Sequence, residues 1–165
     1  MAQDFDIKFI DHSGNPIEGS CEQVGREGTS LANAFEYSVS RPIDATSGKS
    51  TGRKIHEPVK VWKEVDKATP IIKQNAYDGR VFHEVIIRFW RPSMDGTSDI
   101  FYTCTLRGAR IVSHSTQQLH NQFEGAVNIS VPLFEVIELS FESIDWNYAS
   151  EGLSARDKWN SARRS

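Results

Sequence analysis

The sequence has few cysteines and no long apolar run. Two cysteines, Cys21 and Cys104, occur among 165 residues, and they are far apart, without the short spacing of zinc ligands. We expect both to be buried free thiols. No stretch approaches the ~18 apolar residues of a membrane helix, so no membrane insertion is predicted. The first residues are polar and acidic, unlike a signal peptide, so we expect a cytoplasmic protein whose export, if any, needs no cleaved leader.

The chain also lacks an excess of positive charge. It carries 19 lysines and arginines against 22 acidic residues, which gives a formal net charge of −3 at pH 7. This balance creates no field that would gather nucleic acid or an anionic membrane surface. We therefore predict neither nucleic acid nor a membrane as a partner.

The motifs that could carry chemistry fail on spacing or on context. Gly48-Lys49-Ser50 matches the end of a phosphate-binding loop, but that loop needs a glycine at position 43, which is Ile43. The five histidines lack the spacing of a zinc site and are expected on the surface. Cys104 shares its strand face with apolar residues, where a thiol is inert. We expect no catalytic residue, no cofactor and no metal.

The length and composition suit a single domain over residues 1–165. The chain is 38% hydrophobic, and a domain of this size buries roughly 70% of the surface that its unfolded chain exposes. From about residue 149 the sequence becomes a polar tail, with Trp159 as its one large apolar anchor. The prediction is one β-barrel domain followed by this tail.

One short helix is predicted near the middle of the chain. Thr69 can cap the helix with its hydroxyl, and Pro70 suits the first helical position, where no backbone donor is missed. Ile71 and Ile72 then give the helix a short apolar face, and Gly79 ends it after about two to three turns. Strands with alternating apolar residues precede and follow the helix, over residues 55–65 and 85–89.

The same alternation marks further strands, over residues 5–10, 31–39, 100–113 and 133–142. Leu31, Phe35 and Val39 are expected on the buried face of the second of these. Ile144 and Trp146 fall on the opposite parity from the apolar residues before them, so a bulge is expected near residues 142–143. Residues 115–130 are polar and are predicted to form a loop. About seven half-buried strands predict a mainly β fold, an antiparallel β-barrel or sandwich with one short flanking α-helix.

Residues 43–53 contain almost nothing that a hydrophobic core would accept. They are predicted to form an exposed loop between two strands, and exposed loops on a rigid scaffold often carry binding contacts. The loop is long for a hairpin connection, and long loops are usually functional or disordered. An ordinary mobile hairpin tip is the alternative interpretation.

Four segments together resemble the haemolysin-coregulated protein (Hcp) family, which supplies the inner tube of bacterial type VI secretion systems. They are Ser47–Arg53, Val65–Pro70, Glu84–Phe89 and Ile144–Tyr148. Val65-Asp66-Lys67-Ala68-Thr69-Pro70 is the most specific of the four. The resemblance covers residues 50–148 well and the first strand loosely.

This resemblance implies a barrel that closes into a homo-hexameric ring. Rings would stack head to tail into a tube that is propelled out of the cell and secreted, with effectors carried in its lumen. Sheath, spike and effector proteins would be partners. The resemblance assigns ring stacking to the loop residues Ser47, Gly48, Lys49, Ser50, Thr51, Gly52 and Arg53, with Lys49, Arg53 and Lys54 as candidates for polar contacts to the next ring. From the predicted helix start itself, we expect Thr69, Pro70, Ile71 and Ile72 to take part in helix packing or in the protomer interface.

A monomeric β-barrel that binds a small ligand or a sugar, with possible hydrolytic activity, is the competing prediction. Trp62, Trp90 and Trp146 lie on predicted strands and could line such a site. Aromatic residues on strands are, however, more often part of a core or an interface. Particle size separates the two predictions, because a monomer favours the ligand-binding barrel and a six-fold ring favours the tube protein.

Overall fold

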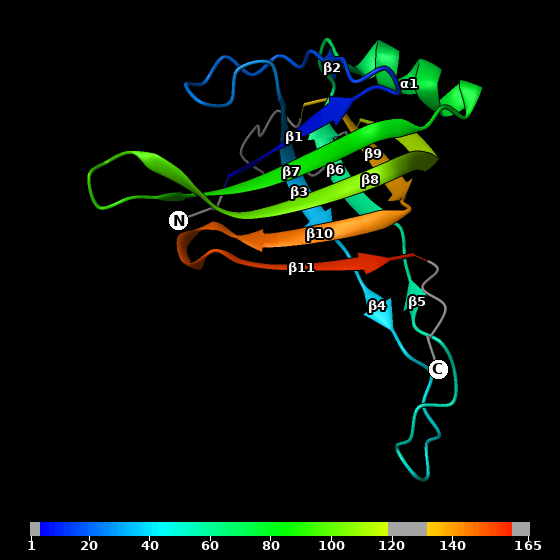
Figure 1. The fold of residues 1–165 in the computed structure, drawn as a ribbon. Coiled ribbons are helices and arrows are strands. Elements are labelled where there is room, and N and C mark those ends of the chain that lie inside the picture. Colours follow the sequence, from blue (N-terminus) through cyan, green and yellow to red (C-terminus); the bar gives the residue numbers. More distant parts are fainter. Residues whose placement is uncertain (1–3, 119–131, 160–165) are drawn as a thin grey trace, which may run out of the picture.

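The computed structural model describes residues 4–118 and 132–159, and they form a mainly β structure with one α-helix (Figure 1). A ring of antiparallel strands closes into a barrel, in the order β1 (Phe5–Ile10), β3 (Ser30–Glu36), β6 (Val59–Glu64), β9 (Phe134–Ser140), β8 (Ser98–Gln117) and β7 (Phe82–Pro92), which pairs again with β1. The short strand β2 (Pro16–Ile17) pairs with the end of β1. The predicted fold class, an antiparallel β-barrel with one short helix, is confirmed.

Strand β8 is 20 residues long and belongs to both the barrel and an extension of its sheet. Its second half pairs with β9, and its first half pairs with β10 (Ser143–Tyr148). Gly108 lies between the halves with φ 58°, and a Cβ there would clash with the side chain of Glu142. The bulge expected near residues 142–143 is instead a break between two strands, where the chain leaves the barrel for the extension.

The segment from residue 149, which was expected to be a polar tail, folds back onto the sheet. The 3₁₀ turn η1 (Ala149–Glu151) and Gly152, with φ 65°, reverse the chain into β11 (Leu153–Lys158). All residues of β11 pair with β10, so backbone hydrogen bonds hold a strand whose side chains are mostly polar and exposed. Trp159 packs edge-on against Phe141, with ring centroids 4.9 Å apart.

Three strand predictions differ in detail from the structure. The register of β3 on β6 shifts between Ala32 and Ala34, so Leu31, which was expected in the core, is 38% exposed. Val39 lies in a separate strand, β4 (Val39–Ser40), and is also exposed. The predicted loop over residues 115–130 begins too early, because β8 continues to Gln117; residues 119–130 lie outside the described chain.

Helix α1 (Thr69–Asp78) lies at one end of the barrel (Figure 1). Pro70 stands in its first turn, and Gly79 ends it in the left-handed conformation, as predicted. This helix, the one α-helix among the described residues, is too short and too polar to cross a membrane.

The predicted cap of the helix is wrong. Ala68 is the N-cap residue, and the helix has no side-chain capping hydrogen bond. The Asp66 carboxylate accepts the backbone N–H of Ala68 itself at 3.1 Å. The hydroxyl of Thr69 instead accepts the N–H of Asp66 at 3.0 Å. The predicted apolar face is wrong in part, since Ile72 is fully buried while Ile71 is 50% exposed.

A buried ionic cluster joins the start of the helix to the barrel. Lys63 and Glu135 are both fully buried, with 2.5 Å between Nζ and Oε1. Asp66 Oδ1 lies 3.0 Å from the same Nζ, and Thr69 donates its hydroxyl to Glu135 at 2.9 Å. His114, which was expected on the surface, reaches the other oxygen of Glu135 at 2.7 Å. Each buried charge therefore has a partner of opposite sign, which its burial requires.

We expect the two isoleucines of the helix to respond differently to a charge. Ile72→Asp would bury a carboxylate without a partner and destabilise the fold by about 3–5 kcal/mol. Ile71→Asp, the matched control one position away, should change the free energy of unfolding by less than about 0.5 kcal/mol. Chemical denaturation of both variants measures this, and equal losses would contradict the assigned face.

The ionic cluster yields a second prediction. Lys63→Met leaves Glu135 buried without its cation and should destabilise the protein by about 3–5 kcal/mol. The double variant Lys63→Met with Glu135→Leu contains neither buried charge. Its loss of unfolding free energy should therefore be smaller, by at least about 1 kcal/mol, than the summed losses of the two single variants. Additive losses in denaturant titrations would show that Lys63 and Glu135 are not coupled.

Candidate functional site

The most prominent projection of the molecule is a hairpin that stands away from the barrel (Figure 1). Strand β4 pairs with β5 (Ile55–His56), and residues 41–53 between them are all exposed. The exposed loop predicted over residues 43–53 is therefore confirmed. Residues Ser47–Arg53, to which the resemblance assigns ring stacking, run from its tip back towards β5.

The tip of the hairpin is held by hydrogen bonds within the loop. The Asp44 carboxylate accepts the N–H groups of Ser47 at 2.7 Å and of Thr46 at 2.9 Å, and the hydrogen bond from Ser47 lowers the pKa of Asp44. The backbone of Asp44 also pairs with Lys49, and Gly48 turns the chain with φ 67°. The loop thus has a defined conformation without support from the barrel.

Six side chains of the hairpin, three apolar and three cationic, are left exposed by the protomer. Val39, Ile43 and Ile55 are apolar yet 49%, 62% and 53% exposed. The cations of the hairpin are exposed as well, and Arg41, Lys49 and Arg53 form no ion pair with any described residue. The hairpin therefore offers an apolar and cationic surface to another molecule.

The base of the hairpin is clamped by the C-terminal strand. Asp157 on β11 contacts Lys54 Nζ and lies 2.9 Å from His56 Nε2. His56, expected on the surface, is 5% exposed and stacks on Trp159 with centroids 5.9 Å apart. Lys54, expected to contact the next ring, instead forms this ion pair within the protomer. Sequence reasoning missed the clamp, since its two sides are about a hundred residues apart.

The clamp continues through His56 to a third side chain, Tyr37. Tyr37 Oη lies 2.8 Å from His56 Nδ1, in line with Asp157 on the other ring nitrogen. Burial, with a contribution from Asp157, raises the pKa of Tyr37 to about 12. The hydroxyl is thus protonated, and it can donate to Nδ1 while Nε2–H donates to Asp157. These contacts fix the hairpin to the sheet.

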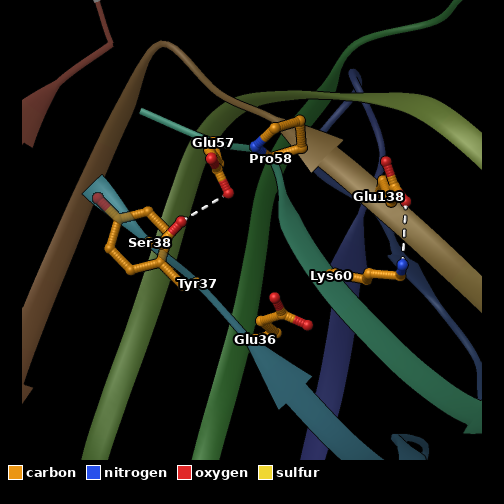
Figure 2. A pocket seen from close by; sticks show the side chains of 7 residues that line it. All are labelled: Glu36, Tyr37, Ser38, Glu57, Pro58, Lys60 and Glu138. Carbon is orange, nitrogen blue, oxygen red and sulfur yellow. Dashed lines mark hydrogen bonds and ion pairs between the residues drawn. The ribbon is translucent and has the colours of Figure 1, made fainter. Parts of the chain in front are cut away.

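A small polar pocket lies beside the hairpin base, with a volume of about 200 Å³ (Figure 2). Within it Ser38 donates its hydroxyl to Glu57 at 2.7 Å, and Lys60 lies 3.5 Å from Glu138. The full lining is Glu36, Tyr37, Ser38, Glu57, Pro58, Lys60 and Glu138. Carboxylates dominate this lining, and Tyr37 is its single aromatic side chain.

The tryptophans of the ligand-binding prediction do not form one site. Trp62 lies under the Lys60 ammonium at 5.1 Å. Trp90 is buried and donates Nε1–H to Asp6 at 3.1 Å. Trp146 packs against Tyr37, with centroids 6.1 Å apart. The structure gives each indole a separate structural contact.

The helix start is divided between the core and the surface. Thr69 and Ile72 are buried inside the protomer, whereas Pro70 and Ile71 are exposed. Only the exposed pair can meet a second protomer without a change in fold. Thr69 and Ile72 therefore pack the helix within the protomer, and only Pro70 and Ile71 remain candidates for the interface between protomers.

Both cysteines are buried and free, as predicted. Burial, with a contribution from Asp145, raises the pKa of the Cys104 thiol to about 12, so the thiol remains unionised and unreactive. Across residues 4–118 and 132–159, histidine, cysteine, aspartate and glutamate form no group of three that could hold a metal ion.

Comparison with known proteins places the chain in a family. The family model for "Type VI secretion system effector, Hcp" matches residues 8–148. The major exported protein of Pseudomonas aeruginosa is 31% identical over 143 residues, which cover 87% of this chain and 82% of the relative.

Solved structures agree on the fold. The Hcp1 protein of the Escherichia coli pathovar EAEC 042 superposes with a TM-score of 0.85 at 24% identity, over 96% of this chain and 99% of that one. A second solved Hcp protein gives a TM-score of 0.87 at 20% identity, over 98% and 100% of the two chains. This chain belongs to the Hcp family of type VI secretion systems.

Proposed function

We propose that the chain forms homo-hexameric rings that stack head to tail into the secreted inner tube of a type VI secretion system, with effectors carried in the lumen. Membership of the Hcp family and similarity to a major exported protein support this function. Sheath, spike and effector proteins are the proposed partners. The barrel interior is packed with side chains such as Ile7, Val61 and Leu106, so cargo would occupy the channel of the ring and not the protomer.

The hairpin is the observation that carries the stacking part of the proposal. An isolated two-stranded hairpin is at best marginally stable in water, yet this one projects from the barrel with Val39, Ile43 and Ile55 exposed. A second copy that covers these side chains would stabilise it. Stacking requires a contact between unlike surfaces that does not close on itself, and a projection at one end of the barrel supplies one half of such a contact.

The ring itself is tested by particle mass. The protomer has a mass of 18.6 kDa, and light scattering combined with negative-stain imaging should give a six-fold ring with a central hole. A mass near that of one protomer across a wide range of concentrations would favour the monomeric ligand-binding barrel.

The stacking loop yields a separate prediction. Deletion of Ser47–Ser50, or Lys49→Glu combined with Arg53→Glu, should leave the hexamer and its thermal stability nearly intact and shorten the tubes. Each exposed contact contributes only about 0–1 kcal/mol, but six copies act together at every joint between rings. Imaging measures tube length, and immunoblotting of the medium measures secretion.

Arg91→Glu combined with Arg110→Glu is the matched control, because both arginines are exposed and lie outside the hairpin. Control tubes should grow to normal length. Normal tubes from the loop variants would overturn the stacking assignment, and loss of the ring would move the loop to the interface between protomers.

A further inference from the structure

We propose that the hairpin tip of one ring docks into a groove at the opposite end of the barrel in the next ring. The groove is lined by Ser20, Cys21, Leu31, Glu64, Val65 and Asp66. This inference rests on the proposed stacking and names the surface that receives the loop. Its occupant is a second copy of this chain.

The positions of the two surfaces suit a head-to-tail contact. Figure 1 shows the hairpin projecting from one end of the barrel, while β2 and α1 lie at the other end. The groove belongs to this second end, because Val65 and Asp66 directly precede α1 and Ser20 follows β2. When rings stack in the same orientation, the hairpin end of one copy faces the groove end of the next.

The groove combines exposed apolar side chains with a rigid wall. Leu31 is 38% and Val65 36% exposed, and the groove has a volume of about 190 Å³. Asp66 fixes the wall, since its carboxylate accepts the Ser30 hydroxyl at 2.6 Å and the Ser20 N–H at 3.2 Å. Hydrogen bonding by Ser30 and the charge of Lys63 lower the pKa of Asp66 despite its burial. The groove is thus formed before any partner arrives, which limits the entropy lost on docking.

The apolar part of the groove matches the hairpin. Ile43 is 62% exposed near the tip, and it lies across from Ser50 in the hairpin. A side chain that fills a small pocket can anchor an interface when the contacts around it exclude water. Ile43 is therefore the anchor we assign to the hairpin.

The charges of the two surfaces are complementary. Arg41, Lys49 and Arg53 give the hairpin three cations without an ion pair among the described residues, and the hairpin's Asp44 is turned onto its own backbone. At the groove, Glu64 belongs to the lining and Glu22 directly follows Cys21; both are exposed carboxylates without an ion pair in the described chain. Lys67 is an exposed cation at the same end and offsets one of them. Opposite charges at the rim select the partner and orient it.

A charge-swap experiment tests the pairing. Lys49→Glu with Arg53→Glu reverses the hairpin, and Glu22→Lys with Glu64→Lys reverses the groove. Each pair alone should lower the association constant between rings by at least about tenfold, because like charges then meet at six joints. All four changes in one chain restore opposite charges at every joint, so association should return to within about threefold of the unmodified protein.

The matched control is Glu151→Lys with Asp99→Lys, which makes the same change in net charge at exposed positions outside the groove and the hairpin. Light scattering checks that every variant forms hexamers, and sedimentation measures the stacking of rings. The proposed groove would be overturned if the groove reversal stacks like the control. It would also be overturned if the variant with all four changes does not regain ring stacking. A hairpin reversal that stacks normally would instead overturn the stacking role of the loop.

Cross-linking gives an independent measurement on hexamers that stack. Both cross-linking variants carry Cys21→Ser, which removes the native free thiol from the groove. In this background Ile43→Cys with Val65→Cys should, on oxidation, join copies in successive rings and give a reducible ladder of covalent multimers. Ile43→Cys with Asp99→Cys is the control and should give no ladder, because residue 99 lies outside the groove. Stacks that form without a ladder in the first variant would show that the hairpin docks elsewhere.

Discussion

Closure of the barrel is the constraint on which the rest of this structure depends. Six strands satisfy one another's backbone hydrogen bonds around the barrel, so the barrel has no free strand edge. Its two ends remain open. The two ends are sealed by different chemistry. The helix and the Lys63–Glu135 cluster close one end, and aromatic side chains around Phe141 and Trp159 close the other. Each seal also positions a surface proposed for assembly, the groove at the first end and the hairpin at the second.

The sequence predicted the elements whose boundaries are set by local chemistry. Pro70 and Gly79 mark the helix because one lacks a backbone donor and the other adopts a left-handed conformation with little strain. The exposed loop was predictable because residues 43–53 offer nothing to a core. Alternation likewise located most of the barrel strands, since one face of each is buried.

The elements that escaped prediction depend on distant partners. Lys63 and Glu135 were given no role from the sequence, and only their meeting across β6 and β9 makes their burial possible. Strand β11 reads as a polar tail because its order comes from backbone pairing with β10. Leu31 was placed on the wrong face since a bulge, which alternation cannot reveal, reverses the parity of β3. The same bulge leaves Leu31 exposed at the groove, so the least predictable part of the strand contributes to a proposed binding surface.

Because both thiols are buried and unpaired, the stability of the fold should not depend on the redox potential of its surroundings. Cys104 is 1% and Cys21 7% exposed, and neither is paired. A disulfide would tie the stability of a protein to an oxidising compartment, and an exposed thiolate would invite oxidation. Here neither liability exists, so reducing and oxidising surroundings should support the same structure. A protein that folds on one side of a membrane and works on the other can therefore cross without any change in its covalent chemistry.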